Sequence, residues 1–204
     1  SHALLEDHAD VLPGDARAYV EQIITAGRKM SDLVEGLLAL SRVTRGELRV
    51  DRVDVSALAR QRLAELAACE PSRTAAVEVE PGLSVQGDQR MIASVLDNLL
   101  DNAWKYTGTT TQPTIRVQGC TADGMSGFCV TDNGAGFDMA HAARLFQAFQ
   151  RLHRQDEFPG IGIGLATVQR IVRRHGGQIV AQGTPGQGAT FSVLLPARAE
   201  QPQE

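Results

Sequence analysis

Asp132-Asn133-Gly134-Ala135-Gly136 is the stretch of sequence that decides the predicted fold. Residues 127–131 before it, Gly-Phe-Cys-Val-Thr, are apolar and β-branched, which is typical of a buried strand. An acid at a strand end, followed by two glycines one residue apart, indicates backbone that comes close to a ligand with a carboxylate directed at it. Taken alone, the same pattern also fits an Asn-Gly turn at the end of a strand.

Upstream, a helix expected to begin after Asp88 carries a polar face. Asn98, Asn102 and Lys105 occupy positions i, i+4 and i+7 of this helix and therefore share one side. Amide oxygens and an ammonium suit Mg²⁺ and phosphates, because Mg²⁺ prefers oxygen ligands and keeps several waters. The alternative is the polar outer face of an ordinary amphipathic helix, and Asp101 beside it fits plain solvent-facing charge.

Downstream, Gly160-Ile161-Gly162-Ile163-Gly164-Leu165 precedes another predicted helix. The backbone amides of such a loop, together with the helix N-terminus, can bind phosphate oxygens. The glycine spacing and the polar segment before it disfavour a Rossmann dinucleotide site, and the absence of a following Lys-Ser or Lys-Thr excludes a Walker A loop. A plain turn is the alternative.

The composition is that of an ordinary globular protein of 204 residues, 22% of them charged and 43% hydrophobic. The net charge of −4 argues against nucleic-acid binding, no signal peptide is visible, and no apolar run reaches the roughly 18–20 residues of a membrane helix. Cys69, Cys120 and Cys129 lack metal-binding spacing and are expected to be buried free thiols. We therefore expect a cytoplasmic chain without nucleic-acid or direct membrane contacts, whose parent could still be membrane-anchored.

The order of the predicted elements gives an α+β protein. Residues 1–46 are expected to form a partial helical hairpin, because apolar residues recur every three to four positions from Val20 to Leu37. The stripe is wider than one partner helix covers, which predicts a homodimeric four-helix bundle; a helix packed on its own domain is the alternative. Residues 47–199 are expected to form an α/β sandwich, and residues 200–204 a frayed tail.

Within residues 47–199, short strands and helices alternate. Ser56 is expected to cap a helix that ends near Cys69, and Asp88 is expected to cap the next one. Two further helices are predicted after Asp138 and from Leu165 to His175. The predicted strands cover 53–55, 75–80, 83–86, 115–120, 128–131, 178–182 and 189–195.

In this order, the segments resemble the catalytic and ATP-binding domain of bacterial sensor histidine kinases. Residues 98–106 match that family's N-box, 132–136 its G1 box and 160–165 its G2 box; 145–151 and 186–191 are similar to its F-box and last glycine motif. The surroundings of the F-box look most like phytochrome-related and PAS-linked kinases. The resemblance covers nearly the whole chain and implies the fold of histidine kinases and Hsp90-type ATPases, a mixed sheet under a layer of helices.

The resemblance also implies ATP and Mg²⁺ as cofactors. Asp132 would accept a hydrogen bond from the adenine amino group, because a carboxylate only accepts, and Tyr106 would lie near the base. Asn102, with Asn98, would hold Mg²⁺, and Lys105 would face the phosphates. The other nucleotide contacts implied by the motifs are Gly134, Gly136, Gly160, Gly162, Gly164, Leu165 and Thr190.

A mobile lid over residues 150–159 is implied as well. Arg151 in this lid would reach the γ-phosphate, so that Asn98, Lys105 and Arg151 are the predicted catalytic residues. Ile161 departs from the family pattern, because the family usually has a hydroxyl residue between the first two glycines.

The phosphate acceptor is the largest departure from the family pattern. His2 is not followed by the acidic residue and the proline that accompany the accepting histidine, so the acceptor is expected upstream of this chain. The implied partners are a second copy, through the hairpin, and a response regulator receiver domain. Two alternatives stay open: a regulatory nucleotide-binding module that transfers no phosphate, and a plain dimerisation hairpin with a degenerate sandwich.

Overall fold

A computed structural model describes residues 16–20, 22–24, 26, 27, 30, 47–150, 152, 158, 160 and 162–196. The chain divides into two compact units, Ser1–Arg42 and Val43–Glu204. The described residues of the first unit are helical. The rest of the predicted hairpin over 1–46 and the tail 200–204 lie outside the described residues.

Three large apolar side chains of the first unit are exposed. Tyr19, Ile23 and Met30 keep 64%, 59% and 62% of their surface accessible. Their spacing places them on one face of a helix, as the predicted apolar stripe requires.

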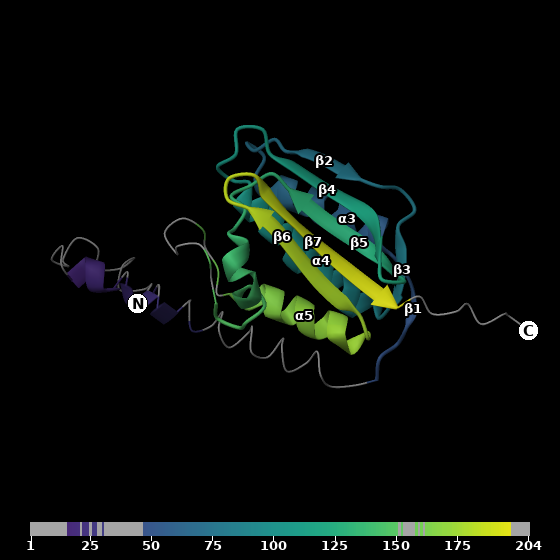
Figure 1. Cartoon of the computed structure of the whole chain (residues 1–204). Coiled ribbons are helices and arrows are strands. Elements are labelled where there is room, and N and C mark those ends of the chain that lie inside the picture. Colours follow the sequence, from purple (N-terminus) through teal and green to yellow (C-terminus); the bar gives the residue numbers. More distant parts are fainter. Residues whose placement is uncertain are drawn as a thin grey trace, which may run out of the picture. The chain divides into compact units, whose positions relative to one another are not determined.

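The second unit is a two-layer α/β sandwich, as predicted (Figure 1). Its five-stranded sheet has the order β2-β4-β5-β7-β6, with β2 parallel to β4 and the other pairs antiparallel. A second sheet pairs β1 with β3. Helices α3, α4 and α5 cover one face of the larger sheet (Figure 1). The strands are β1 Asp51–Asp54, β2 Ala76–Val79, β3 Ser84–Gly87, β4 Thr114–Ala122, β5 Met125–Asp132, β6 Gln178–Thr184 and β7 Gly188–Pro196; the helices are α3 Val55–Cys69, α4 Gln89–Tyr106 and α5 Gly164–Arg174, with the 3₁₀ helix η1 at Met139–Arg144.

Alternation along the central strands fixes which face of the sheet is buried. In β5, Phe128, Val130 and Asp132 are buried while the residues between them are partly accessible. In β7, Phe191 and Val193 lie opposite Val130 and Phe128 in the strand register and join the same core. The end of β5 therefore directs Asp132 to the face that carries the helices.

Helix α4 supplies the other half of this core. It buries apolar side chains along its whole length, namely Ile92, Val95, Leu96, Leu99, Leu100, Ala103 and Trp104. Asp88 caps it as predicted, with its side chain accepting hydrogen bonds from Arg90 N and Met91 N. The cap and the apolar stripe together hold the opposite, polar face of α4 in a fixed direction.

Helix α3 begins two residues earlier than predicted. Its N-cap is Asp54, whose Oδ1 accepts from Ala57 N at 2.8 Å, so the prediction of Ser56 as the cap is wrong. Ser56 is buried instead, where its hydroxyl donates to Glu80 O and accepts from Leu83 N. It ties the start of α3 to the strands beside it.

The three cysteines are free thiols, but their predicted burial is wrong. Cys69, at the end of α3, is exposed, while Cys120 and Cys129 are partly accessible. Cys120 and Cys129 occupy the alternate positions of β4 and β5 that point away from the helical layer. None of the three thiols therefore belongs to the hydrophobic core.

Candidate nucleotide-binding site

Asp132 ends β5 as a buried carboxylate. Its side chain is 7% exposed, and Oδ1 accepts a hydrogen bond from Gly134 N at 2.8 Å. Burial raises the pKa of this carboxyl to about 6, against the lowering effect of the Gly134 and Ala189 amides. A buried carboxylate that carries only two backbone amide donors can accept further hydrogen bonds, and at neutral pH it is predominantly ionised.

Two glycines after Asp132 are required by the backbone around them. A Cβ on Gly134 would lie 2.4 Å from Tyr106 O, and one on Gly136 would lie 2.0 Å from Thr184 O, at a φ of +61°. The G1 segment is thereby packed against the end of α4 on one side and the end of β6 on the other. Ala135 N donates to Tyr106 O at 3.0 Å, which fixes the segment to α4.

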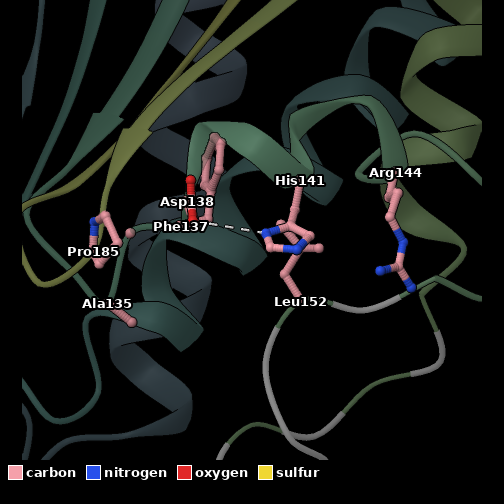
Figure 2. A pocket seen from close by; sticks show the side chains of 8 residues that line it. Ala135, Phe137, Asp138, His141, Arg144, Leu152 and Pro185 are labelled. Atoms are coloured by element: carbon pink, nitrogen blue, oxygen red, sulfur yellow. Dashed lines mark ion pairs between the residues drawn. The ribbon is translucent and has the colours of Figure 1, made fainter.

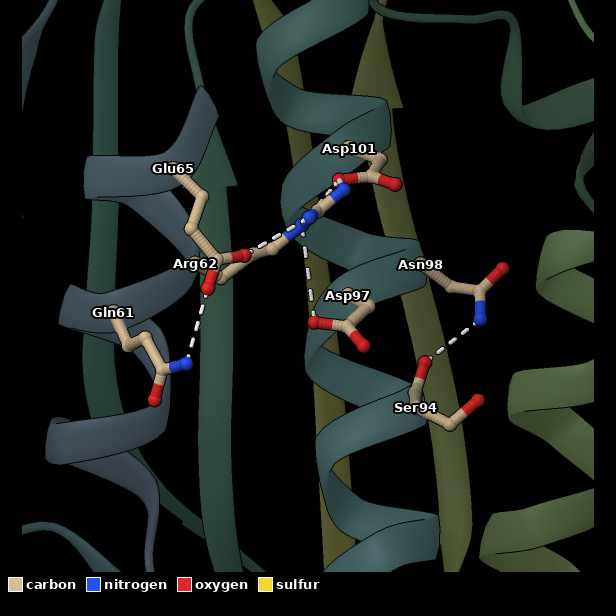
Figure 3. Close-up of polar contacts among 7 residues, drawn as sticks. All are labelled: Gln61, Arg62, Glu65, Ser94, Asp97, Asn98 and Asp101. Carbon is tan, nitrogen blue, oxygen red and sulfur yellow. Dashed lines mark hydrogen bonds and ion pairs between the residues drawn. The ribbon is translucent and has the colours of Figure 1, made fainter. Parts of the chain in front are cut away.

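Helix α4 presents different chemistry to its two neighbours (Figure 3). Towards α3, Asp97 and Asp101 meet Arg62, which also contacts Glu65; Arg62 Nη2 lies 2.7 Å from Asp101 Oδ1 and Arg62 Nε lies 3.8 Å from Asp97 Oδ1. Asp101 is thus an interhelical ion-pair partner rather than plain solvent-facing charge. Figure 3 shows Asn98 on the other side of the helix, away from this network.

The polar face of α4 lies against the glycine-rich G2 segment. Asn98 Nδ2 donates to Ser94 O at 2.7 Å, and a Cβ on Gly164 would lie 2.5 Å from Asn98 Oδ1. At the other end of the segment, a Cβ on Gly160 would lie 3.5 Å from Lys105 Nζ. Any side chain at position 164 would therefore displace Asn98 Oδ1.

Lys105 lies between Asn102 and Tyr106. Its Nζ donates to Asn102 Oδ1 at 3.2 Å and lies 4.3 Å from the centre of the Tyr106 ring. Phe158 packs edge-on against the same ring, with centroids 4.9 Å apart. Sequence reasoning did not find Phe158, because nothing local in the sequence pairs a residue in a polar loop with one on a distant helix.

Helix α5 starts at Gly164, the last of the G2 glycines. Its N-cap, Ile163, makes no side-chain capping hydrogen bond, while Thr167 Oγ1 donates back to Ile163 O. The first amides of a helix carry partial positive charge and suit phosphate oxygens. Gly164 and Leu165 contribute these amides beside Asn98, so the helix N-terminus and the polar face of α4 converge.

Thr190 does not join these residues. Its hydroxyl is hydrogen-bonded to that of Thr131 at 3.0 Å, and both belong to the alternate set that points away from the helices. Ala189 is paired with Asp132 and is buried on the helical side. The alternation of Phe191, Val193 and Leu195 in the sequence already indicates that position 189, rather than 190, faces the core.

A cavity of about 240 Å³ adjoins the G1 segment (Figure 2). Figure 2 shows Asp138 and His141 next to one another in its lining, with Asp138 Oδ2 and His141 Nδ1 3.9 Å apart. Only Gly136 among the lining residues belongs to the predicted site. The cavity is lined by Ala135, Gly136, Phe137, Asp138, His141, Arg144, Leu152 and Pro185.

Arg151, Ile161 and most of the predicted lid over 150–159 lie outside the described residues. Across the part of the chain that the structure describes, no three His, Cys, Asp or Glu side chains gather as a metal site. Within the same ranges, no helix is long and apolar enough to cross a membrane.

The geometry defines a nucleotide-binding α/β sandwich: a buried carboxylate at a strand end, a helix bearing amides and a lysine, and a glycine loop at a helix N-terminus. The chain belongs to the family described as histidine kinase-, DNA gyrase B- and HSP90-like ATPases, whose model matches residues 87–199. Its catalytic domain is of the sensor histidine kinase type.

The chain is similar over most of its length to known kinases. It is 32% identical over 189 residues to the phytochrome-like protein Cph1 of Synechocystis, covering 93% of this chain and 25% of Cph1. It is 28% identical over 204 residues to the sensor-like histidine kinase SenX3 of Mycolicibacterium smegmatis, covering 96% and 52%. The chain thus spans about a quarter of Cph1 and about half of SenX3, and the predicted likeness to phytochrome-related kinases is confirmed.

Solved structures of histidine kinases share the fold. Full-length ShkA, crystallised in complex with AMPPNP, gives a TM-score of 0.66 at 27% identity, covering 96% of this chain and 42% of ShkA. The mycobacterial sensor histidine kinase MprB gives a TM-score of 0.60 at 25% identity, covering 72% and 97%.

Proposed function

We propose that residues 47–196 bind ATP with Mg²⁺ and present its γ-phosphoryl group to a histidine outside the described domain. The observation that carries the proposal is the buried Asp132 carboxylate at the end of β5, in a segment that is hydrogen-bonded to the last turn of α4. The structural likeness to ShkA, which was solved with the ATP analogue AMPPNP, supports the same ligand.

The base would be read by Asp132. A carboxylate accepts hydrogen bonds only, so it pairs with the amino group of adenine and opposes the carbonyl that guanine carries at the same position. Gly134 and Gly136 carry no side chains, so the backbone next to Asp132 is open to a base. Tyr106, at the end of α4, bounds the site on that side.

The phosphates would lie between α4 and the G2 segment. Lys105 supplies the positive charge, and Gly160, Gly162, Gly164 and Leu165 supply backbone amides at the start of α5. Phosphoryl transfer depends chiefly on positioning and on neutralising the phosphate charge, which this arrangement provides. Arg151 stays a proposed γ-phosphate ligand on the family pattern alone, and Thr190 is left out of the proposed site.

The donor set fits Mg²⁺. The Asn98 side chain donates to Ser94 O through Nδ2, so this hydrogen bond does not use Oδ1. The Oδ1 atom is directed at the N-terminus of α5. Neutral amide oxygens from Asn98 and Asn102, completed by phosphate oxygens and water, are ligands that Mg²⁺ prefers. When bound, Mg²⁺ would neutralise phosphate charge; the protein residues hold and orient the nucleotide.

Titration calorimetry on the full chain tests this function. We expect ADP and ATP to bind, with Mg²⁺ strengthening ATP binding, and GTP to bind at least about 100-fold more weakly because guanine sets a carbonyl against the Asp132 carboxylate. Equal affinity for ATP and GTP, or no binding of ATP with Mg²⁺, would overturn the proposal.

We also propose that the first unit forms a homodimer and that a response regulator receiver domain accepts the phosphoryl group. The exposed Tyr19, Ile23 and Met30 side chains support the dimer, since large apolar side chains on one helix face are normally covered by a partner.

The dimer makes a direct prediction. Ile23→Glu should shift the full chain towards monomer, because a charge at a covered apolar position opposes association, whereas Ala18→Glu on another side of the helix should not. Light scattering over a concentration series measures both. A monomeric wild type at every concentration would contradict the prediction.

A further inference from the structure

The last turn of α4 is held from two sides. Ala135 N of the G1 segment donates to Tyr106 O at 3.0 Å. From the other side, Arg73, in the segment between α3 and β2, donates through Nη2 to Trp104 O at 2.5 Å and to Thr107 Oγ1 at 2.7 Å. Lys105 and Tyr106 lie between these two attachments. We propose that Arg73 is a positioning residue of the nucleotide site, acting through Trp104 and Thr107 on Lys105 and Tyr106.

The guanidinium of Arg73 is fixed in direction as well as in position. It stacks over the Trp104 ring, with Cζ 4.4 Å from the ring centre, and Nη1 lies 3.5 Å from Glu70 Oε2. The side chain is only 15% exposed. A planar cation that both stacks and donates in its own plane defines an orientation that a lysine ammonium cannot reproduce.

Stability alone does not account for this arrangement. Arg73 Nε and Trp104 Nε1 are buried without a hydrogen-bond acceptor among the described residues. A buried donor without a partner costs stability, and an apolar side chain of similar length would stack on Trp104 without that cost. What the arginine adds is a pair of directed bonds to the helix end.

These bonds reach the proposed ligands through short links. Thr107 Oγ1 donates to Ala103 O at 2.7 Å, so Arg73 and Thr107 together close the C-terminal turn of α4. Tyr106 O, in that turn, lies where a Cβ on Gly134 would clash at 2.4 Å. A movement of the turn would therefore shift Lys105 against the G2 segment and Tyr106 against the G1 segment together.

The inference rests on the proposed function and is tested on the full chain with ADP. Arg73→Met keeps an unbranched stem over Trp104 but loses both directed bonds; we expect about tenfold weaker ADP binding, with Arg73→Lys intermediate. Arg60→Met is the matched control, because Arg60, on α3, also donates to a backbone carbonyl, that of Val79 in β2. It should bind ADP like the wild type.

Trp104 is the only tryptophan, so its fluorescence reports on this turn directly. ADP should change the emission of the wild type and of Arg60→Met, and should change it less in Arg73→Met.

Thermal melting distinguishes a loss of positioning in the site from a loss of folding stability. If Arg73→Met lowers only the melting temperature and keeps wild-type affinity and emission change, the inference fails; if the wild type itself binds no ADP, the proposed function fails with it. Should Arg73→Met not fold, wild-type ADP affinity in Arg73→Lys would equally overturn the inference.

Discussion

Asp132→Asn should weaken ATP and ADP binding roughly 100-fold, the size expected for losing a buried hydrogen bond to a charged group. The carboxylate already accepts from the Gly134 and Ala189 amides. The substituted amide keeps a single oxygen for these donors, and its NH₂ then faces the amino group of adenine with a second donor. Titration calorimetry at pH 7.5 measures the loss.

Asp138→Asn is the matched control for this loss. Asp138 follows the G1 segment and caps η1 by accepting from Ala140 N, and asparagine caps a helix about as well as aspartate. We expect its nucleotide affinity to stay within about twofold of the wild type. Equal affinity of Asp132→Asn and wild type would remove Asp132 from the site.

The elements that carry the site could be predicted because each has a strong local signal. The N-cap at Asp88, the apolar stripe of α4 and the acid-glycine pattern at the end of β5 are all local in sequence. The polar face of α4 followed from helical periodicity alone. The contact between this polar face and the G2 glycines did not follow from periodicity. The family resemblance implied only that both segments bind the nucleotide.

The errors have local physical reasons. Asp54 and Ser56 are both good N-cap residues two positions apart, and the sequence does not show that the Ser56 hydroxyl is taken by Glu80 O and Leu83 N. Thr190 was implied by the family's last glycine motif, whereas strand alternation with Phe191 places Ala189 on the helical face. At the start of α3, a chemically suitable residue was therefore preferred to the position that the backbone uses.

Contacts between distant segments could not be predicted. Phe158 reaches Tyr106 from the polar loop, and Arg73 reaches Trp104 from the connection after α3. Neither residue has a periodic or motif signal, because each is defined by what it meets across the fold. For this reason no role was predicted for Arg73.

The raised pKa of Asp132 also implies that the site costs stability. The carboxyl has a pKa of about 6 in the folded chain, against an ordinary value of 3.8, because burial disfavours its ionised form. Between these two pH values the folded state holds a proton that the unfolded state has released. Stability therefore falls as pH rises through this window, and above about pH 6 the full cost, roughly 3 kcal/mol, applies.

Asp132→Asn should consequently be more stable than the wild type at neutral pH while binding nucleotide more weakly. Without nucleotide, its advantage in the free energy of unfolding should grow by roughly 2 kcal/mol between pH 4.5 and pH 7.5. Urea denaturation of both proteins at the two pH values measures this difference, in which all other titrating groups cancel. A constant difference would show that Asp132 is not held as a costly buried carboxylate. Weaker binding by a more stable protein, in contrast, would exclude misfolding as the cause of the lost affinity and would leave the carboxylate with a role that only a ligand explains.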